Sequence, residues 1–173
     1  MKWEGNPLSI NYATFEWGNY IIYLAATAEG LCFISAGKDG ETELKAWHQK
    51  YFKNRTLKEG DAALNEYKDE IAHYLTGKKE IFQSQVQLYG TEFQRKVWNE
   101  LRNIPFGETR SYTDIATTIG RPKAVRAVAN AIGNNPLLFI VPCHRVIRKD
   151  GSLSGFRAGT ELKEKLLQLE KIQ

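Results

Sequence analysis

Short apolar runs in the first part of the chain predict strands. Residues 20–25 (YIIYLA) and 31–35 (LCFIS) are rich in β-branched and aromatic residues, which favour a pleated, half-buried surface. The dipeptide Glu29-Gly30 lies between them as a turn signal. The two runs therefore predict neighbouring strands of a short sheet.

Helical patterns follow these strands. Hydrophobic residues recur at helical spacing near residues 41–52 and 61–75, and Gly77 ends the second stretch. Residues 81–88 alternate in their second half and could form a strand or an extended connector. We therefore predict a small N-terminal α/β domain over residues 1–87.

Beyond this point the pattern becomes mainly helical, and residues 88–173 are predicted to form a second domain. The expected helices cover residues 91–104, 113–119, 121–133 and a last stretch from about Thr160. The middle two are joined by a tight turn that contains Gly120, which is the layout of a helix-turn-helix. Residues 137–141 form an apolar run that could be a buried strand. The fold class expected for the whole chain is therefore α/β (α+β), with a short N-terminal sheet followed by a helical, winged-helix-like domain.

The expected helix over residues 121–133 has two different faces. Its core face is apolar and contains Val125, Val128, Ala129 and Ile132. Its opposite face carries two cations, an amide and an alanine, namely Lys123, Arg126, Ala127 and Asn130. Small side chains between cations would let the helix approach a nucleic-acid groove closely. The exposed face of an ordinary amphipathic helix has the same pattern, so this feature alone leaves both interpretations open.

Charge is distributed unevenly along the chain. The net charge is +4, with 10 Lys and Arg against 12 Asp and Glu in residues 1–90, and 14 against 8 in residues 91–173. A basic second half, which includes Arg110 and Arg121, favours a polyanion-binding domain, although a solvated basic face is the alternative. No apolar run approaches a membrane span, the start lacks a signal-peptide pattern, and two cysteines fit a reducing interior. We therefore expect a cytoplasmic protein.

Cys143 has the sequence context of a reactive thiol. Pro142 precedes it, and His144 and Arg145 follow it. A thiol reacts as its thiolate, so a neighbouring base or cation increases its reactivity. A Cys-His dipeptide also fits an inert structural cysteine. Cys32, in contrast, has apolar neighbours and no basic residue beside it, and we expect it to pack as a small hydrophobe.

Two further polar residues stand in unusual places. Glu170 lies near the apolar arc of the last helix and at its C-terminal end, where the helix dipole disfavours a negative charge, so it could orient a histidine. Lys163 shares that arc, which leaves a frayed, solvated end open as well. The hydroxyl of Tyr112 could bond either a core group or a ligand. The scattered two cysteines and three histidines predict no zinc site.

Several segments of the second half resemble the O6-alkylguanine-DNA alkyltransferases, also called methylated-DNA–protein-cysteine methyltransferases. Residues 141–146 (VPCHRV) look like the active-site motif of that family. The likeness extends, in family order and spacing, through residues 104–112 (IPFGETRSY), 121–128 (RPKAVRAV) and 134–136 (NNP). It covers about half the chain, whereas residues 1–87 are similar to the family's variable N-terminal domain only in length and coarse pattern.

The resemblance implies a function in DNA repair. The family flips an O6-alkylated guanine, chiefly O6-methylguanine, out of duplex DNA from the minor groove, because the alkyl carbon is out of reach inside the stack. It then moves the alkyl group irreversibly to its own cysteine, once per molecule. The resemblance implies double-stranded DNA as the partner, no cofactor and a monomer. Some relatives hold a structural zinc in the N-terminal domain, but this sequence shows no ligand set for it, and it shows no membrane segment.

The resemblance also implies roles for individual residues. Cys143 would accept the alkyl group, and His144, oriented by Glu170, would act through a water as its base. Tyr112 would donate to guanine N3, and Asn135 would brace the turn around the active site.

Other residues would contact the DNA and the flipped base. Arg126 would enter the base stack in place of the flipped nucleotide. The remaining DNA contacts would come from Lys123, Ala127, Asn130, Arg110 and Arg121. The substrate pocket would be formed by Tyr112, Val146, Phe156, Arg157 and Arg145. The carbonyls of Cys143 and Val146 would read the guanine amino group, and the N–H of Arg157 would contact O6. Arg145 would also hold the recognition-helix region to the active-site loop.

Three other functions fit parts of the sequence. A lesion-binding protein of the alkyltransferase-like kind would bind alkylguanine without transfer, but such proteins lack the cysteine that is present here as Cys143. A helix-turn-helix regulator would explain the basic helix but not the Pro-Cys-His-Arg sequence. A Cys-His hydrolase would turn over repeatedly and would not need the basic helix.

Overall fold

The structure, a computed structural model, describes residues 8–60 and 62–171. The chain divides into two compact units, Met1–Tyr89 and Gly90–Gln173. In the described residues no helix is both long and apolar enough to cross a membrane.

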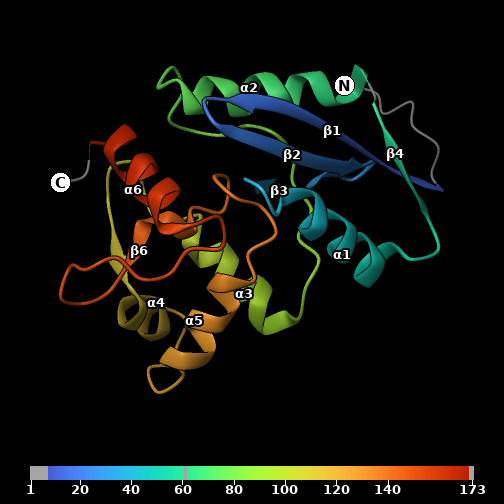
Figure 1. Cartoon of the computed structure of the whole chain (residues 1–173). Helices are drawn as coiled ribbons and strands as arrows, with labels where there is room; N and C mark the ends of the chain where they lie inside the picture. The colour runs from blue at the N-terminus through green and yellow to red at the C-terminus, as the bar shows by residue number, and fades with distance from the viewer. Residues whose placement is uncertain (1–7, 61, 172–173) are drawn as a thin grey trace. The chain divides into compact units, whose positions relative to one another are not determined.

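The first unit is built on a four-stranded sheet (Figure 1). In spatial order its strands are β3 (Gly30–Ala36), β2 (Tyr20–Thr27), β1 (Ser9–Trp17) and β4 (Thr56–Glu59). β2 runs antiparallel to both β1 and β3, whereas β4 runs parallel to β1. The two predicted strands are confirmed as β2 and β3, and β1 and β4 are additional to the prediction.

Two helices complete this unit. α1 (Gly40–Phe52) contacts β2 and β3, and α2 (Asn65–Leu75) contacts β1. The second helix begins later than predicted because a separate 3₁₀ turn, η1 (Ala62–Leu64), precedes it, and Asp61 lies outside the described residues. Residues 81–88 are mainly a connector that touches the sheet through one bridge, between Leu31 and Val86.

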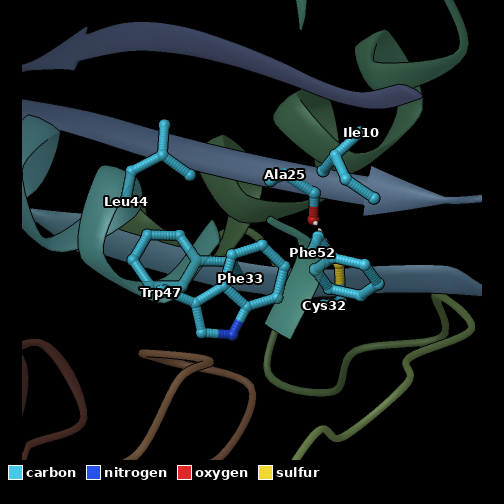
Figure 2. Packing of buried hydrophobic residues seen from close by; sticks show 7 residues of the cluster. All are labelled: Ile10, Ala25, Cys32, Phe33, Leu44, Trp47 and Phe52. Atoms are coloured by element: carbon cyan, nitrogen blue, oxygen red, sulfur yellow. Dashed lines mark hydrogen bonds between the residues drawn. The ribbon is translucent and has the colours of Figure 1, made fainter. Parts of the chain in front are cut away.

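The core of the first unit is aromatic and aliphatic. Figure 2 shows its central cluster, which consists of Ile10, Ala25, Cys32, Phe33, Leu44, Trp47 and Phe52. The Cys32 thiol is completely buried and donates a hydrogen bond to the Ala25 carbonyl at 3.4 Å, drawn as a dashed line in Figure 2. The prediction that Cys32 packs in the core is confirmed.

The second unit is mainly helical (Figure 1). Its helices are α3 (Glu92–Leu101), α4 (Tyr112–Thr118), α5 (Val125–Gly133) and α6 (Thr160–Leu169), and the short strands β5 (Arg110–Ser111) and β6 (Val146–Ile147) pair in parallel. α4 and α5 form the predicted helix-turn-helix. The indole N–H of Trp98 donates to the Ala131 carbonyl at 2.8 Å and joins α3 to α5. The mixed fold class predicted from the sequence is confirmed.

Two local predictions for this unit are wrong. α5 begins at Val125 and not at Arg121, because residues 121–124 form a turn in which the Ala124 N–H donates to the Arg121 carbonyl. A residue that precedes proline, as Arg121 does, is disfavoured in the helical conformation. Residues 137–141 are a buried turn and not a strand, since Phe139 has a φ of 72° and the Val141 N–H donates to the Leu137 carbonyl.

Candidate active site

Cys143 lies in a tight turn. The residues Cys143–Arg145 form a 3₁₀ turn, η2, directly after Pro142, and the Arg145 N–H closes it on the Pro142 carbonyl at 2.9 Å. On a strand, the side chains of Cys143 and His144 would point to opposite faces. The turn removes that constraint, so neighbouring residues of the motif can serve one site.

Asn135 connects the two ends of the loop that leads to the cysteine. Its side-chain oxygen accepts from the Leu137 N–H at 2.9 Å, and its amide nitrogen donates to the Val141 carbonyl at 2.8 Å. The same nitrogen lies 3.2 Å from the Cys143 sulfur as a donor. Asn135 is itself buried. It therefore holds the loop and the sulfur atom together, as a brace would.

The thiol of Cys143 is buried, and its environment acts on its pKa in two directions. Burial raises the pKa above the ordinary value, because the thiolate loses solvation. The hydrogen bond from Asn135 and the positive charges of Arg157 and Lys163 lower it, but burial dominates. The resting group is therefore mainly a thiol at neutral pH, so its reaction as a thiolate requires a base.

His144 follows Cys143 directly and is paired with Glu170. It is completely buried, and its Nε2 lies 2.8 Å from Glu170 Oε1. Burial lowers the pKa of His144; the hydrogen bond and charge of Glu170 oppose this, and the cations Arg145 and Lys163 add to it. With a lowered pKa the imidazole is neutral at pH 7, and its hydrogen on Nε2 is assigned by the contact with the carboxylate. Nδ1 is then the ring nitrogen that can accept a proton.

Glu170 is fixed from three sides. It caps α6 at its C-terminal end and is buried. Besides His144, it accepts hydrogen bonds from Arg145 Nε at 2.9 Å and from the Gly107 N–H at 3.3 Å. Burial of a carboxylate is tolerable here because a cation and hydrogen-bond donors compensate it.

Arg145 has a different environment from the one predicted. Its guanidinium also donates to the Ile104 carbonyl at 2.6 Å and lies over the Phe106 ring, 5.8 Å from the centroid. It is buried in this network and neither lines the pocket described below nor bonds the recognition helix α5 in the described structure. Its physical role is to pair with Glu170 and tie the motif to the segment that follows α3.

A pocket of about 500 Å³ opens beside the cysteine. This volume is in the usual range for small-ligand sites. The pocket brings together six of the predicted site residues, which are Tyr112, Arg126, Asn135, Cys143, Phe156 and Arg157. Val146, which was also predicted for the pocket, is not among the residues that line it: Val146 is buried, and its carbonyl accepts a hydrogen bond from the Lys163 ammonium at 2.7 Å.

Tyr112 reaches the pocket because of the short parallel strand pair. β5 aligns Arg110 with Val146 and Ser111 with Ile147, so the residue that begins α4 directly after β5 lies close to the motif. Ser111 fixes this start by capping α4 in a reciprocal pair with Asp114. The Tyr112 hydroxyl forms a short hydrogen bond with the Ser154 hydroxyl.

The residues of the predicted basic face are exposed, but only some of them lie on α5. Arg126, Ala127 and Asn130 are exposed on α5, and Arg126 also lines the pocket. Lys123 and Arg121 are exposed in the turn before α5. Arg110 is paired with Glu108 at 2.8 Å, a partly exposed ion pair of the kind that contributes little stability.

Two residues that contact the predicted site residues Val146 and Tyr112, namely Lys163 and Ser154, were not predicted from the sequence. Lys163 is almost completely buried on α6 and donates to Val146 and to Ser154, which in turn bonds Tyr112. A lysine on the apolar arc of an amphipathic helix was the available signal. For Ser154 we find no signal in the sequence. No group of three or more His, Cys, Asp or Glu side chains that could hold a metal occurs in residues 8–60 and 62–171.

Family models match both halves of the chain. The model described as "6-O-methylguanine DNA methyltransferase, DNA binding domain" matches residues 92–172, and the one described as its "ribonuclease-like domain" matches residues 10–88. An inducible methylated-DNA–protein-cysteine methyltransferase of Bacillus subtilis is 46% identical over 168 residues, which are 97% of this chain and 94% of the relative. One from Methanosarcina acetivorans is 40% identical, over 92% of this chain and 97% of the relative.

Solved structures agree with the sequence comparisons. The crystal structure of a Mycobacterium tuberculosis O6-methylguanine methyltransferase has a TM-score of 0.81 at 35% identity, covering 94% of this chain and 93% of the other. A structure of that bacterium's protein in complex with DNA has a TM-score of 0.81 at 36% identity, covering 93% and 92%.

Proposed function

The chain belongs to the 6-O-methylguanine DNA methyltransferase family, and on this premise we propose that Cys143 is the residue that accepts the alkyl group. The function is DNA repair by direct reversal of damage, in which the alkyl group of O6-alkylguanine moves to a protein cysteine. The observation that carries the assignment is the pocket in which Cys143 lies with Tyr112 and Arg126. Cys32, the other cysteine, is enclosed in the core of the first unit.

Activation of the thiol starts from a neutral imidazole. His144 accepts the thiol proton at Nδ1 through a bridging water, while its Nε2–H stays bonded to Glu170. The resulting imidazolium is stabilised by the carboxylate. Before the proton transfer His144 is neutral, and Arg145 alone balances the charge of Glu170. The buried carboxylate is therefore paired in the resting state as well.

The transfer step is a displacement at the alkyl carbon. The thiolate sulfur of Cys143 forms a bond to that carbon as the bond between carbon and guanine O6 breaks, and the bonding electron pair stays with the guanine. Tyr112 donates its hydroxyl hydrogen toward N3 of the leaving base, which stabilises the charge that develops there. Asn135 keeps the sulfur in position through the contact of 3.2 Å.

Access to the base requires extrusion from the helix. The alkyl carbon cannot reach a thiolate inside the base stack, so the nucleotide turns out into the pocket. Arg126, exposed on α5 and at the pocket, replaces it in the stack, with the minor groove as the side of entry. The net charge of +6 over residues 91–173 favours the phosphate backbone. We further propose that the chain binds as a monomer in the compartment that holds the DNA.

The product explains why each molecule acts once. A thioether has no leaving group that water displaces readily, so Cys143 remains alkylated. The lesion-binding alternative is disfavoured by the presence of Cys143 and by the transferase names of the relatives. A repeatedly acting Cys-His hydrolase would not stop after one event.

Stoichiometry tests this proposal. Increasing amounts of protein are mixed with an excess of a duplex that contains O6-methylguanine, and the restored guanine is quantified after digestion of the DNA. We expect a plateau at one repaired lesion per molecule. Continued repair beyond that ratio would instead support a hydrolase, and tight binding without repair would support a lesion-binding protein.

A further inference from the structure

Lys163 is a buried cation that the proposed transfer step does not use. It has a relative exposure of 1% on α6. Its ammonium donates to two neutral oxygen atoms, the Val146 carbonyl at 2.7 Å and the Ser154 hydroxyl at 3.1 Å. Burying an ammonium is costly, so a lysine held in this way calls for a function or a strong structural reason.

Ser154 extends this contact to the pocket. Its hydroxyl bonds Lys163 on one side and the Tyr112 hydroxyl on the other. Ser154 and Tyr112 both line the pocket that contains Cys143. The three side chains therefore form a continuous hydrogen-bonded chain from the buried face of α6 to the first residue of α4.

The chemistry of the three side chains determines which group donates in each of these hydrogen bonds. An ammonium can only donate, so the Ser154 oxygen is the acceptor of the bond from Lys163. The single hydrogen of Ser154 is then available for the Tyr112 oxygen. If Ser154 donates there, the hydrogen of Tyr112 is left to point into the pocket. Successive hydrogen bonds of this kind polarise one another and make the last group a better donor.

We propose that Ser154 and Lys163 are positioning residues for Tyr112, which direct its hydroxyl hydrogen toward the flipped base and return a proton to it after transfer. This inference rests on the proposed function. The protons balance: N3 of the leaving guanine takes the Tyr112 hydrogen, Ser154 passes its hydrogen to the tyrosine oxygen, and Lys163 passes one to Ser154. Lys163 becomes a neutral amine and later regains one proton from the solvent, while the imidazolium of His144 releases to the solvent the proton that it took from the thiol.

The surroundings of Lys163 agree with this role. Burial lowers the pKa of Lys163 to about 8, the charge of Arg148 adds to this, and Cys143 opposes it. An ammonium with a pKa near neutrality releases a proton more easily than an exposed lysine does.

A double-mutant cycle separates positioning from packing. Single-turnover transfer from an O6-methylguanine duplex is measured for four proteins at saturating concentration: wild type, Ser154→Ala, Tyr112→Phe and the double variant. A positioned proton donor is worth about 10²–10⁴ in rate. We expect Ser154→Ala to slow transfer about tenfold or more when Tyr112 is present and by less than about twofold in the Tyr112→Phe protein. Affinity for the undamaged duplex should not change.

Conservative variants and a matched control sharpen the test. Ser154→Thr keeps the hydroxyl and should restore most of the rate. Lys163→Met should slow transfer at least as much as Ser154→Ala, because it also removes a positive charge that lowers the pKa of the Cys143 thiol. The part of its effect that passes through Tyr112 should disappear in the Tyr112→Phe protein. Ser152→Ala is the control, because Ser152 is exposed in the same loop and bonds Asp150 instead; its rate should equal that of the wild type.

Several outcomes would overturn the inference. Equal slowing by Ser154→Ala with and without Tyr112 would mean that the serine acts by packing. A wild-type rate for Ser154→Ala or for Tyr112→Phe would mean that the chain of hydroxyls does not assist transfer. In each case transfer by the wild type leaves the proposed function intact, whereas a wild-type protein that transfers no methyl group would remove both.

Discussion

Both cysteines of the chain are buried and neither is in a disulfide, but one lies in a sheet and the other in a turn. Cys32 is on β3, where its sulfur bonds the Ala25 carbonyl inside a cluster of apolar side chains. Cys143 begins the turn after Pro142, where its sulfur accepts from Asn135 and faces the pocket. Burial raises the pKa of both thiols.

The two regions differ in the groups that lower the pKa of the thiol and so oppose the effect of burial. For Cys32, burial raises the pKa far above the ordinary range, and the hydrogen bond and cation that lower it have little effect. For Cys143 an amide donor and two cations, Arg157 and Lys163, work against burial, and a neutral histidine follows in the sequence. A cysteine that is only buried is therefore inert. A buried cysteine beside hydrogen-bond donors, cations and a base can form the reactive thiolate.

The largest expected effect comes from exchanging the sulfur atoms. Cys143→Ser should abolish alkyl transfer, because a buried hydroxyl is a far weaker nucleophile, and should leave affinity for undamaged duplex nearly unchanged. Cys32→Ser should transfer at the wild-type rate and lose about 1–2 kcal/mol of unfolding free energy, since it places a hydroxyl in an apolar cluster. Transfer assays and thermal unfolding of both variants check this; retained transfer by Cys143→Ser would contradict the comparison.

Substitution of two buried glutamates in the described part of the chain, Glu170 and Glu70, should give the next largest effect. Glu170→Gln should slow transfer by about 10²-fold, because His144 loses the carboxylate that stabilises its charged form. Glu70, in the first unit, accepts from the N–H groups of Gln83 and Ser84 and pairs with Lys79 at 2.9 Å. Glu70→Gln should lose about 1–3 kcal/mol of unfolding free energy with no change in transfer rate.

Folding must be monitored for the first of these variants. Glu170→Gln leaves Arg145 without its carboxylate partner, so its unfolding temperature should also fall. His144→Gln is a second variant that keeps the Glu170–Arg145 pair and should slow transfer to a similar extent. Slowing by Glu70→Gln as large as that by Glu170→Gln would mean that the loss follows stability and not chemistry.

The pH dependence of thiol labelling should separate the two cysteines. The pKa of Cys143 lies above its ordinary value, so the thiolate fraction is small at pH 7 and rises about tenfold per pH unit until the pKa is reached. The rate of carbamidomethylation by iodoacetamide at Cys143 should follow this rise between pH 7 and 8, while Cys32 stays unlabelled in the folded protein. A flat profile at Cys143 would show that its thiolate is already formed at neutral pH.

The smallest expected effect concerns one cation. Arg157 lowers the pKa of the Cys143 thiol, so Arg157→Gln should raise that pKa and slow labelling about two- to threefold at pH 7. The difference from wild type should disappear at a pH above both pKa values. Persistence of the difference at high pH would indicate that Arg157 acts through the shape of the pocket.

Much of the first unit could be predicted from the sequence, and what was missed has a physical cause. β2 and β3 are apolar runs, but β1 carries polar residues such as Asn11 and Thr14 among apolar ones. The available signal was Gly18-Asn19, a two-residue link between β1 and β2 in which Gly18 has a φ of 56°. β4 has four residues and is mostly exposed, so its pairing with β1 leaves no mark in its composition.

In the candidate active site, too, some features could be predicted from the sequence and others could not. The motif around Cys143 and the odd place of Glu170 were visible in the sequence, because each breaks a local pattern. The partners of Arg145 were not, since its bond to the Ile104 carbonyl joins residues 41 positions apart through a backbone atom. Lys163 interrupts the apolar arc of its helix, which is visible in the sequence. The reason, its hydrogen bonds to Val146 and Ser154, is visible only in the structure.

The location of the transferred group shows which cysteine accepts it. The protein is mixed with a duplex that contains O6-methylguanine, digested, and its two cysteine-containing peptides are analysed by mass spectrometry. If Cys143 is the acceptor, one methyl group per chain is expected on the peptide that contains Cys143, and none on the peptide that contains Cys32. A methyl group on Cys32, or restored guanine with Cys143 unmodified, would contradict this assignment.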